Sequence, residues 1–208
     1  AKQRRQIAGE GLRGIMQNML FKAKKESTIF TSFLDAIDTY GRKTQIIEDM
    51  SEVEEPYQAL LKKSLALGRI ATKVSQANET VGVLMPNVTN TIALILGMTA
   101  FNRTPALLNY TAGSAGIQNA CIAADIKNVI TSRQFIKKAK LEEVVDALNN
   151  LNILYLEDLR SSFGLLDKIW LMGYALHFPR LVTAPAKPDD AAVVLFTSGS
   201  FFTTLVGS

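Results

Sequence analysis

Sulfur and imidazole chemistry is scarce in this 208-residue sequence, which has one cysteine and one histidine. Cys121 cannot form a disulfide within the chain, so a disulfide-held secreted scaffold is excluded and a reducing compartment fits. His177 alone cannot build a metal site of several histidines or a two-histidine acid/base pair. Any chemistry must therefore come from backbone groups, hydroxyls and charged side chains.

Long apolar runs are also missing. The longest, residues 91–101, is about half the ~20 residues that a membrane-spanning helix needs. The basic start is not followed by an apolar run and a cleavage site, so no signal peptide is recognisable. With 48% hydrophobic residues, 20% charged residues and a mean hydropathy of +0.13, the composition predicts a soluble globular chain that can bury its own core.

Positive charge is concentrated at the start of the chain. Residues 1–26 carry seven basic and two acidic side chains, a balance of +5, whereas the remainder balances to −1. Such a segment is either a basic helix near anionic lipid or nucleic acid, or a solvated linker helix. Aromatic side chains do not alternate with the charges, as base stacking would need, so we expect no nucleic-acid partner.

From residue 27 onward, helical and strand patterns alternate. Apolar residues at helical spacing predict helices over residues 32–40, 57–74, 88–102, 115–125, 134–149 and 163–178. Short apolar runs predict strands at residues 44–48, 81–85, 105–108, 128–131, 153–156 and 191–196. Residues 179–188 read as a linker. The pattern is typical of parallel βαβ units, so the predicted fold class is α/β, a parallel sheet with flanking helices preceded by a helical section over residues 3–25.

The candidate binding site follows the last predicted strand. Phe196 is succeeded by Thr197, Ser198, Gly199 and Ser200. Hydroxyls and a glycine at the carboxyl end of a parallel strand can turn the chain tightly and direct N–H and O–H groups at phosphate oxygens. Open α/β sheets bind ligands at that edge. The segment is not a Walker loop, which needs a lysine and a different glycine spacing, and an ordinary strand-exit turn is the alternative.

The order of these features resembles the adenylate-forming (AMP-binding) enzymes. A helix like that at residues 57–74, a VGVLMPN segment like that at 81–87, a strand running into an asparagine at 109 and a hydroxyl-rich loop at 196–200 occur there in the same order. The resemblance covers about residues 30–200. It implies that residues 197–200 are the first half of a loop that binds the phosphates of ATP, with Mg²⁺ as the accompanying ion.

A narrower resemblance is to the bacterial bifunctional acylglycerophosphoethanolamine acyltransferase/acyl-ACP synthetases. It rests on residues 4–10 (RRQIAGE), 108–113 (LNYTAG), 131–135 (TSRQF), 155–159 (YLEDL) and 167–170 (DKIW). The resemblance implies that ATP and a fatty acid form an acyl-adenylate, and that the acyl group passes to acyl carrier protein and then to a lysophospholipid. It places the whole protein at the cytoplasmic face of the bacterial inner membrane.

This resemblance also implies a division of the chain. Residues 1–26 would leave an upstream acyltransferase domain, and residues 27–200 would begin the synthetase domain. In the family the loop continues with a Gly-x-Pro-Lys-Gly pattern, whereas here Ser200 is followed by Phe201 and Phe202. Residues 201–208 are either a cloning-derived extension, including a reading-frame accident or vector sequence, or a divergent natural sequence, and we expect the cloning-derived extension.

A fragment of this kind lacks the family's later motifs. We expect it to be inactive, with no catalytic residue and no metal ligand of its own, and to self-associate through surface left uncovered. Two alternatives stay open: another AMP-dependent ligase, such as an acyl-CoA synthetase for a different acid, or a non-catalytic α/β module that docks on a membrane or a protein.

Three further features have competing interpretations. Residues 163–178, which include Trp170 and His177, predict either an interfacial helix in peripheral contact with lipid or a helix packed on its own domain. Cys121 lies among apolar residues and is expected to be a buried, unreactive thiol. Asn109 either forms a strand-end turn or shapes a ligand pocket.

Overall fold

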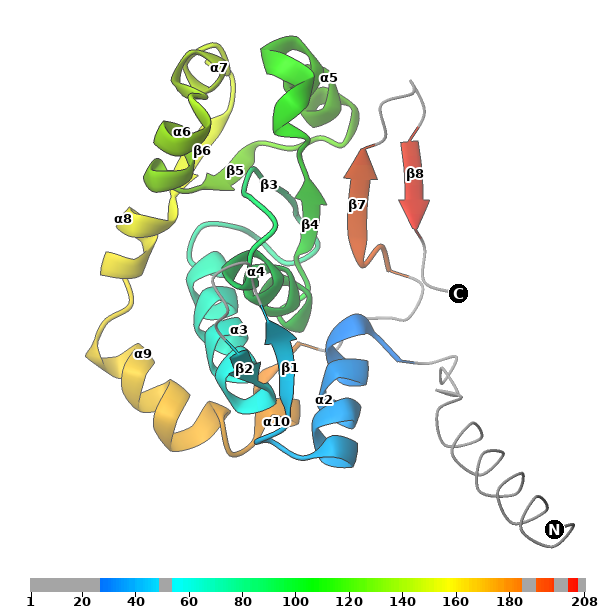
Figure 1. Ribbon diagram of the computed structural model, residues 1–208, viewed down its shortest axis with the longest axis vertical. Helices are drawn as coiled ribbons and strands as arrows, with labels where there is room; N and C mark the ends of the chain where they lie inside the picture. Colours follow the sequence, from blue (N-terminus) through cyan, green and yellow to red (C-terminus); the bar gives the residue numbers. More distant parts are fainter. Residues whose placement is uncertain (1–26, 49–53, 185–189, 197–201, 206–208) are drawn as a thin grey trace, which may run out of the picture.

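A computed structural model describes residues 27–48, 54–184 and 190–196, together with the backbone of 202–205. The predicted helix over residues 3–25 lies outside these ranges. The described residues form a six-stranded sheet with helices on both faces and a separate two-stranded hairpin (Figure 1).

The larger sheet has the strand order β6-β5-β3-β4-β7-β8. Its five parallel strands are β3 (Thr80–Val83), β4 (Thr104–Leu107), β5 (Asn128–Thr131), β6 (Asn152–Tyr155) and β7 (Val193–Phe196). Val81, Ala106 and Val129 are fully buried, as expected for strands covered on both faces. β8 (Phe202–Leu205) pairs antiparallel with β7, within the predicted extension at residues 201–208, whose origin stays a prediction.

Two apolar clusters cover the two faces of this sheet. One is built on α2 (Ile29–Tyr40), α3 (Tyr57–Ala71) and α4 (Thr89–Ala100). The other is built on α5 (Gly113–Ala123), α6 (Arg133–Ala139) and α7 (Glu142–Asp146). The predicted fold class, α/β with a parallel sheet and flanking helices, is therefore confirmed.

The hairpin holds the start of α3. β1 (Gln45–Glu48) pairs antiparallel with β2 (Glu54–Pro56), so the predicted strand at 44–48 exists but lies outside the main sheet. Pro56 is the N-cap of α3, a position where its missing N–H costs nothing. The first N–H of the helix, from Tyr57, instead bonds the Thr44 carbonyl at 3.1 Å.

The prediction of one helix over residues 134–149 is wrong. α6 ends at Ala139 because Lys140 adopts a left-handed conformation with φ 53°. This turn allows Leu141 to enter the core beside Val145, and α7 then starts at Glu142. Helical spacing is retained across the break, so periodicity alone does not reveal it.

The segment between β6 and β7 differs most from prediction. It contains α8 (Leu156–Ser161), α9 (Leu165–Trp170), a π-helical turn η2 (Leu171–Ala175) and α10 (Pro179–Val182). The predicted helix at 163–178 corresponds to α9 and η2, and α10 occupies the start of the predicted linker.

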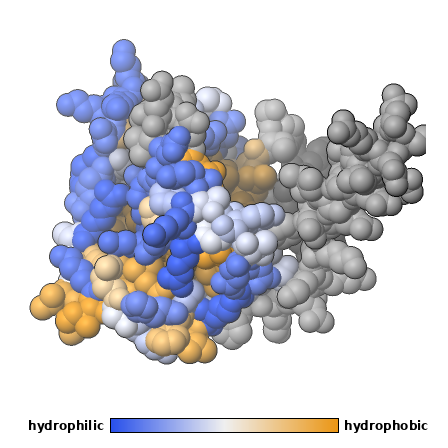
Figure 2. All heavy atoms as spheres, turned by 60° about the horizontal axis from the view of Figure 1, so that its bottom comes forward, coloured by the Kyte–Doolittle hydropathy of each residue, from blue (hydrophilic) through white to orange (hydrophobic). Residues whose placement is uncertain are grey.

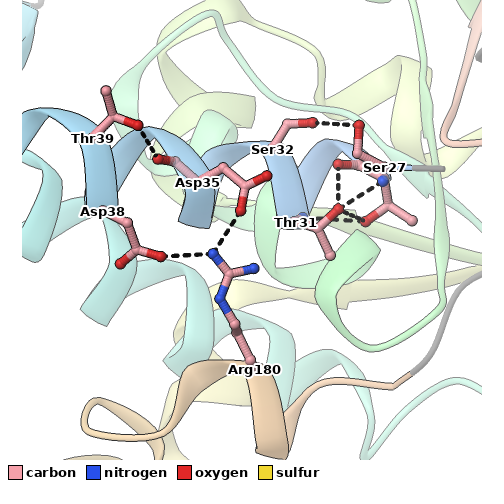
Figure 3. Close-up of polar contacts among 8 residues, drawn as sticks. Ser27, Thr31, Ser32, Asp35, Asp38, Thr39 and Arg180 are labelled. Carbon is pink, nitrogen blue, oxygen red and sulfur yellow. Dashed lines mark hydrogen bonds and ion pairs between the residues drawn. The ribbon is translucent and has the colours of Figure 1, made fainter. Parts of the chain in front are cut away.

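Arg180 of α10 ties this segment to α2. Its Nη2 atom bonds Asp35 at 2.7 Å and Asp38 at 2.8 Å (Figure 3). This contact joins residues that lie more than 140 positions apart in the sequence.

Candidate functional site

The five parallel strands end at one edge of the sheet. The helices that follow β3 and β4, namely α4 and α5, lie in the clusters on opposite faces. Such a divergence is where open α/β sheets bind ligands. β7 lies beside β4, with Leu195 paired to Leu107, so the chain leaves β7 next to this point.

The predicted phosphate-loop residues, Thr197, Ser198, Gly199 and Ser200, lie outside the described residues. In the sequence they follow directly after β7. The three hydroxyl groups and the backbone N–H groups of such a segment are hydrogen-bond donors suited to phosphate oxygens. Their role in binding the phosphates of ATP stays a prediction.

The connection after β4 is a side-chain-capped turn. Asn109 Oδ1 accepts hydrogen bonds from the Thr111 N–H at 3.0 Å and from Thr111 Oγ1 at 2.7 Å. Tyr110 packs edge-on against Phe135 with ring centroids 5.3 Å apart. The strand-end turn predicted for Asn109 is therefore present, and it stands beside the end of β7.

The turn after β3 is also tied down. Thr131 Oγ1 donates to the Leu84 carbonyl at 2.7 Å, and Thr91 Oγ1 donates to the Pro86 carbonyl at 2.6 Å. Thr89, at the start of α4, has a buried hydroxyl without a hydrogen-bond partner among the described residues. The Thr131 and Thr91 hydroxyls thus fix this turn, and the Thr89 hydroxyl does not contribute to it.

A polar network that sequence reasoning missed joins the ends of β5 and β6. Ser132 Oγ donates to Glu157 Oε1 at 2.8 Å, and Glu157 Oε2 accepts from the Arg133 N–H at 3.2 Å. The Arg133 guanidinium makes two 2.6 Å hydrogen bonds to Asp158 and lies 4.2 Å from the centre of the Tyr155 ring. The segments 131–135 and 155–159, singled out by resemblance, therefore bind each other.

Both carboxylates in this network are hydrogen-bonded, Asp158 to the Arg133 guanidinium and Glu157 to a hydroxyl and backbone N–H groups. Burial raises the pKa of Glu157, but hydrogen bonds from Ser132 and from backbone N–H groups outweigh it, so the pKa lies below its usual value. The hydrogen bond from Arg133 likewise lowers the pKa of Asp158. Both carboxylates are ionised at neutral pH and engaged, which suits a structural clamp between two strands.

A cavity of about 340 Å³ opens between α3 and the α8–α9 segment. Its apolar lining comes from Ala66, Leu67, Ile70 and Phe163. Its polar lining comes from Asn90 and three cations, Lys63, Arg160 and Lys168. Lys63 is paired with Glu55, whereas Arg160 and Lys168 have no carboxylate partner in the described part of the chain.

The prediction for Cys121 can be compared with the structure. Cys121 is buried, as predicted, and burial raises the pKa of its thiol to about 11, which disfavours the reactive thiolate. Across residues 27–48, 54–184 and 190–196, no group of three or more potential ligands could hold a metal ion. Nor does any described helix have the length and apolarity needed to cross a bilayer.

The AMP-binding enzyme family matches residues 35–201, most of the chain. The chain belongs to the AMP-binding enzyme family. The matched range includes β7 and, in the sequence after it, the segment 197–200. Enzymes of this family are ATP-using, adenylate-forming ligases, so the broader of the two resemblances is confirmed.

Solved structures agree on the fold of this AMP-binding chain. VinN in complex with 3-methylaspartate has a TM-score of 0.67 at 20% identity, covering 84% of this chain and 45% of that chain. The inhibitor-bound N-terminal domain of FACL13 from Mycobacterium tuberculosis gives 0.61 at 17% identity, with coverages of 84% and 42%. The anthranilate CoA ligase AuaEII in complex with anthranoyl-AMP gives 0.62 at 12% identity, with coverages of 85% and 32%.

At these identities the likeness establishes the fold alone. The AMP-binding chain spans less than half the length of each of these three structures. Its five-stranded parallel sheet with flanking helices is the N-terminal part of the adenylate-forming fold.

Proposed function

We propose that this chain is the N-terminal part of an ATP-dependent ligase that activates a fatty acid as an acyl-adenylate. The acyl group would pass to the thiol of acyl carrier protein and then to a lysophospholipid. The observation that carries the proposal is the family match at residues 35–201, which runs through β7 to the segment 197–200.

The contribution of this chain to the reaction would be positioning. In the proposal, backbone N–H groups and hydroxyls of Thr197, Ser198, Gly199 and Ser200 hold phosphate oxygens of ATP. Mg²⁺ would neutralise part of the phosphate charge when bound. The α-phosphate is thereby oriented for attack by the substrate carboxylate, and pyrophosphate leaves. The Asn109 turn and the Ser132–Glu157 clamp fix the neighbouring strand ends.

The choice of a fatty acid rests on the narrower resemblance at five segments of the sequence. Two of these, 131–135 and 155–159, form the clamp that joins β5 to β6. In the same proposal, residues 1–26 lead from an acyltransferase domain and the 208-residue chain by itself is inactive. A related ligase acting on a different carboxylic acid is the competing candidate.

The test is ATP–pyrophosphate exchange by the full-length protein that contains this chain. We expect exchange with palmitate and none with aspartate or anthranilate. Ser198→Ala should lower the exchange rate by about 100-fold, as loss of a transition-state donor does. Ser32→Ala is the matched control, because its hydroxyl lies on α2 and donates to the Ser27 hydroxyl at 3.1 Å; it should leave the rate nearly unchanged.

Three outcomes would contradict the proposal. Exchange with aspartate or anthranilate in place of palmitate would replace the fatty acid by another substrate. Equal effects of the two serine substitutions would remove the phosphate-binding role of Ser198. Exchange catalysed by the 208-residue chain itself would overturn its description as an inactive part.

A further inference from the structure

An exposed apolar face on α9, η2 and α10 is unexplained by the ligase function. Its side chains are Leu165, Leu166, Ile169, Met172, Phe178 and Leu181, which we call the α9–α10 face. Leu166 is 81% exposed and Leu165 is 72% exposed. Figure 2 brings the lower end of Figure 1 forward and shows hydrophobic side chains gathered along that end of the molecule.

The opposite side of this segment is firmly packed. Asp167 bonds Lys73 at 2.5 Å and Arg69 at 3.2 Å, and Leu171 and Ala175 are buried. The Trp170 ring lies between the Arg69 guanidinium, 5.1 Å away, and Phe101. Both sides of the segment therefore carry apolar side chains. The inner side packs against the rest of the domain, so the α9–α10 face is left facing solvent.

The charged side chains within the segment that carries the α9–α10 face are mostly positive, and of these Arg180 is paired with Asp35 and Asp38 of α2. Residues 160–182 contain a single acidic side chain, Asp167, which is buried and paired. Arg160 and Lys168 converge on the 340 Å³ cavity beside α9, and neither has a carboxylate partner among the described residues. Lys168 also lies in sequence between two members of the face. Exposed apolar side chains thus stand next to uncompensated cations.

This combination matches the boundary of an anionic bilayer. Apolar side chains enter the acyl region, and cations meet phosphate groups at the level of the headgroups. An acidic protein partner would satisfy the cations but would not need a protruding row of long aliphatic side chains. We propose that the α9–α10 face docks on an anionic lipid surface, with Arg160 and Lys168 at a headgroup phosphate in the cavity. The proposal is independent of adenylation.

The structure also selects the residues to change. Trp170 and Leu171 face inward, so substituting them would damage the core rather than the docking face. Leu166→Ser removes an outward side chain. Its control is Ile122→Ser, because Ile122 is 73% exposed on α5, over the other face of the sheet.

The experiment is co-sedimentation of the 208-residue chain with phosphatidylcholine vesicles, with and without phosphatidylglycerol. We expect binding that increases with phosphatidylglycerol. Leu166→Ser should weaken the partition by about tenfold, whereas Ile122→Ser should not. Residues 1–26 carry +5 in every variant, so differences between variants report on the substituted positions.

The contribution of the two cations to vesicle binding is tested by a charge-reversal double variant and a matched control. Arg160→Glu with Lys168→Glu should reduce binding to phosphatidylglycerol vesicles by at least about twentyfold. Lys137→Glu with Lys138→Glu makes the same change in net charge on α6 and should do much less. Emission from Trp170, the one tryptophan, checks that α9 remains packed in each variant.

Several results would overturn the docking proposal. One is a wild-type chain that stays in the supernatant with anionic vesicles at low salt. Another is equal loss of binding from Leu166→Ser and Ile122→Ser. A third is a dimer in sedimentation velocity that Leu166→Ser dissociates while vesicle binding is absent, which would assign the face to a second copy of this chain.

Discussion

Gly68 of α3 and Gly97 of α4 lie in backbone contact where the two helices cross. A Cβ atom on Gly97 would come within 2.6 Å of the Gly68 nitrogen and still closer to the Ser64 carbonyl. A Cβ on Gly68 would come within 2.6 Å of the Phe101 ring and closer to the Gly97 carbonyl. Both obstacles include backbone, so the absence of side chains permits this close packing under the sheet.

Gly97→Ala should therefore destabilise the chain by about 3 kcal/mol or more, because the helices must separate to admit the methyl group. Urea unfolding followed by circular dichroism measures this loss. Gly173→Ala is the control, since nothing lies within 4 Å of its Cβ position, and it should be neutral or slightly stabilising. Equal stability of the two variants would refute the close crossing.

Asp167 should make the stability of the fold depend on pH in the acidic range. The hydrogen bond from Lys73 lowers its pKa most, burial opposes this, and bonds from the Gly164 N–H and Arg69 add to the lowering. A carboxyl whose pKa is lowered in the folded state stabilises the fold at pH values above its ordinary pKa of 3.8. This contribution disappears as the pH falls through the lowered pKa of the folded state.

Asp167→Asn should cost about 1–2 kcal/mol at pH 7, because two partly exposed cations lose their partner. The difference from wild type should shrink below about pH 4. Chemical unfolding at a series of pH values measures it. A difference that stays constant down to pH 2 would contradict the ion pair.

Thr28 should stabilise α2 from its first turn. Its side chain accepts from the Thr31 N–H at 3.2 Å, and Thr31 Oγ1 accepts from the Thr28 N–H at 2.7 Å. Thr28→Ala should cost about 1 kcal/mol. Thr39→Ala, on the same helix, removes only an exposed bond to the Asp35 carbonyl (Figure 3) and should cost less in thermal unfolding. A reversed ranking would exclude the capping box.

Cys121 should resist alkylation in the folded chain. Its thiol is buried and burial raises the pKa to about 11, so thiolate is scarce at pH 8. Iodoacetamide should react at least about 100-fold more slowly than with the same chain in urea. Mass spectrometry over time measures the rates, and rapid labelling without denaturant would show that Cys121 is accessible.

Much of the fold follows from local sequence signals. Strand β5 coincides with the predicted 128–131 run, because an apolar strand buried on both faces is a strong local pattern. The break at Lys140 could not be predicted, since a non-glycine residue adopts the left-handed conformation there only because Leu141 gains a place in the core. The Ser132–Glu157 clamp was also missed, because its partners come from different strand ends.

The sequence by itself determined the α/β class, the order of the strands along the chain and the place of the hydroxyl-rich segment after β7. These depend on hydrophobic periodicity and on short motifs, which are local. Tertiary structure alone decided which side of α9 and η2 is buried, because Trp170 and Leu171 compete with the equally apolar Leu165, Leu166 and Ile169 for one contact surface. Packing against α3 settles that competition and leaves the second apolar side facing solvent.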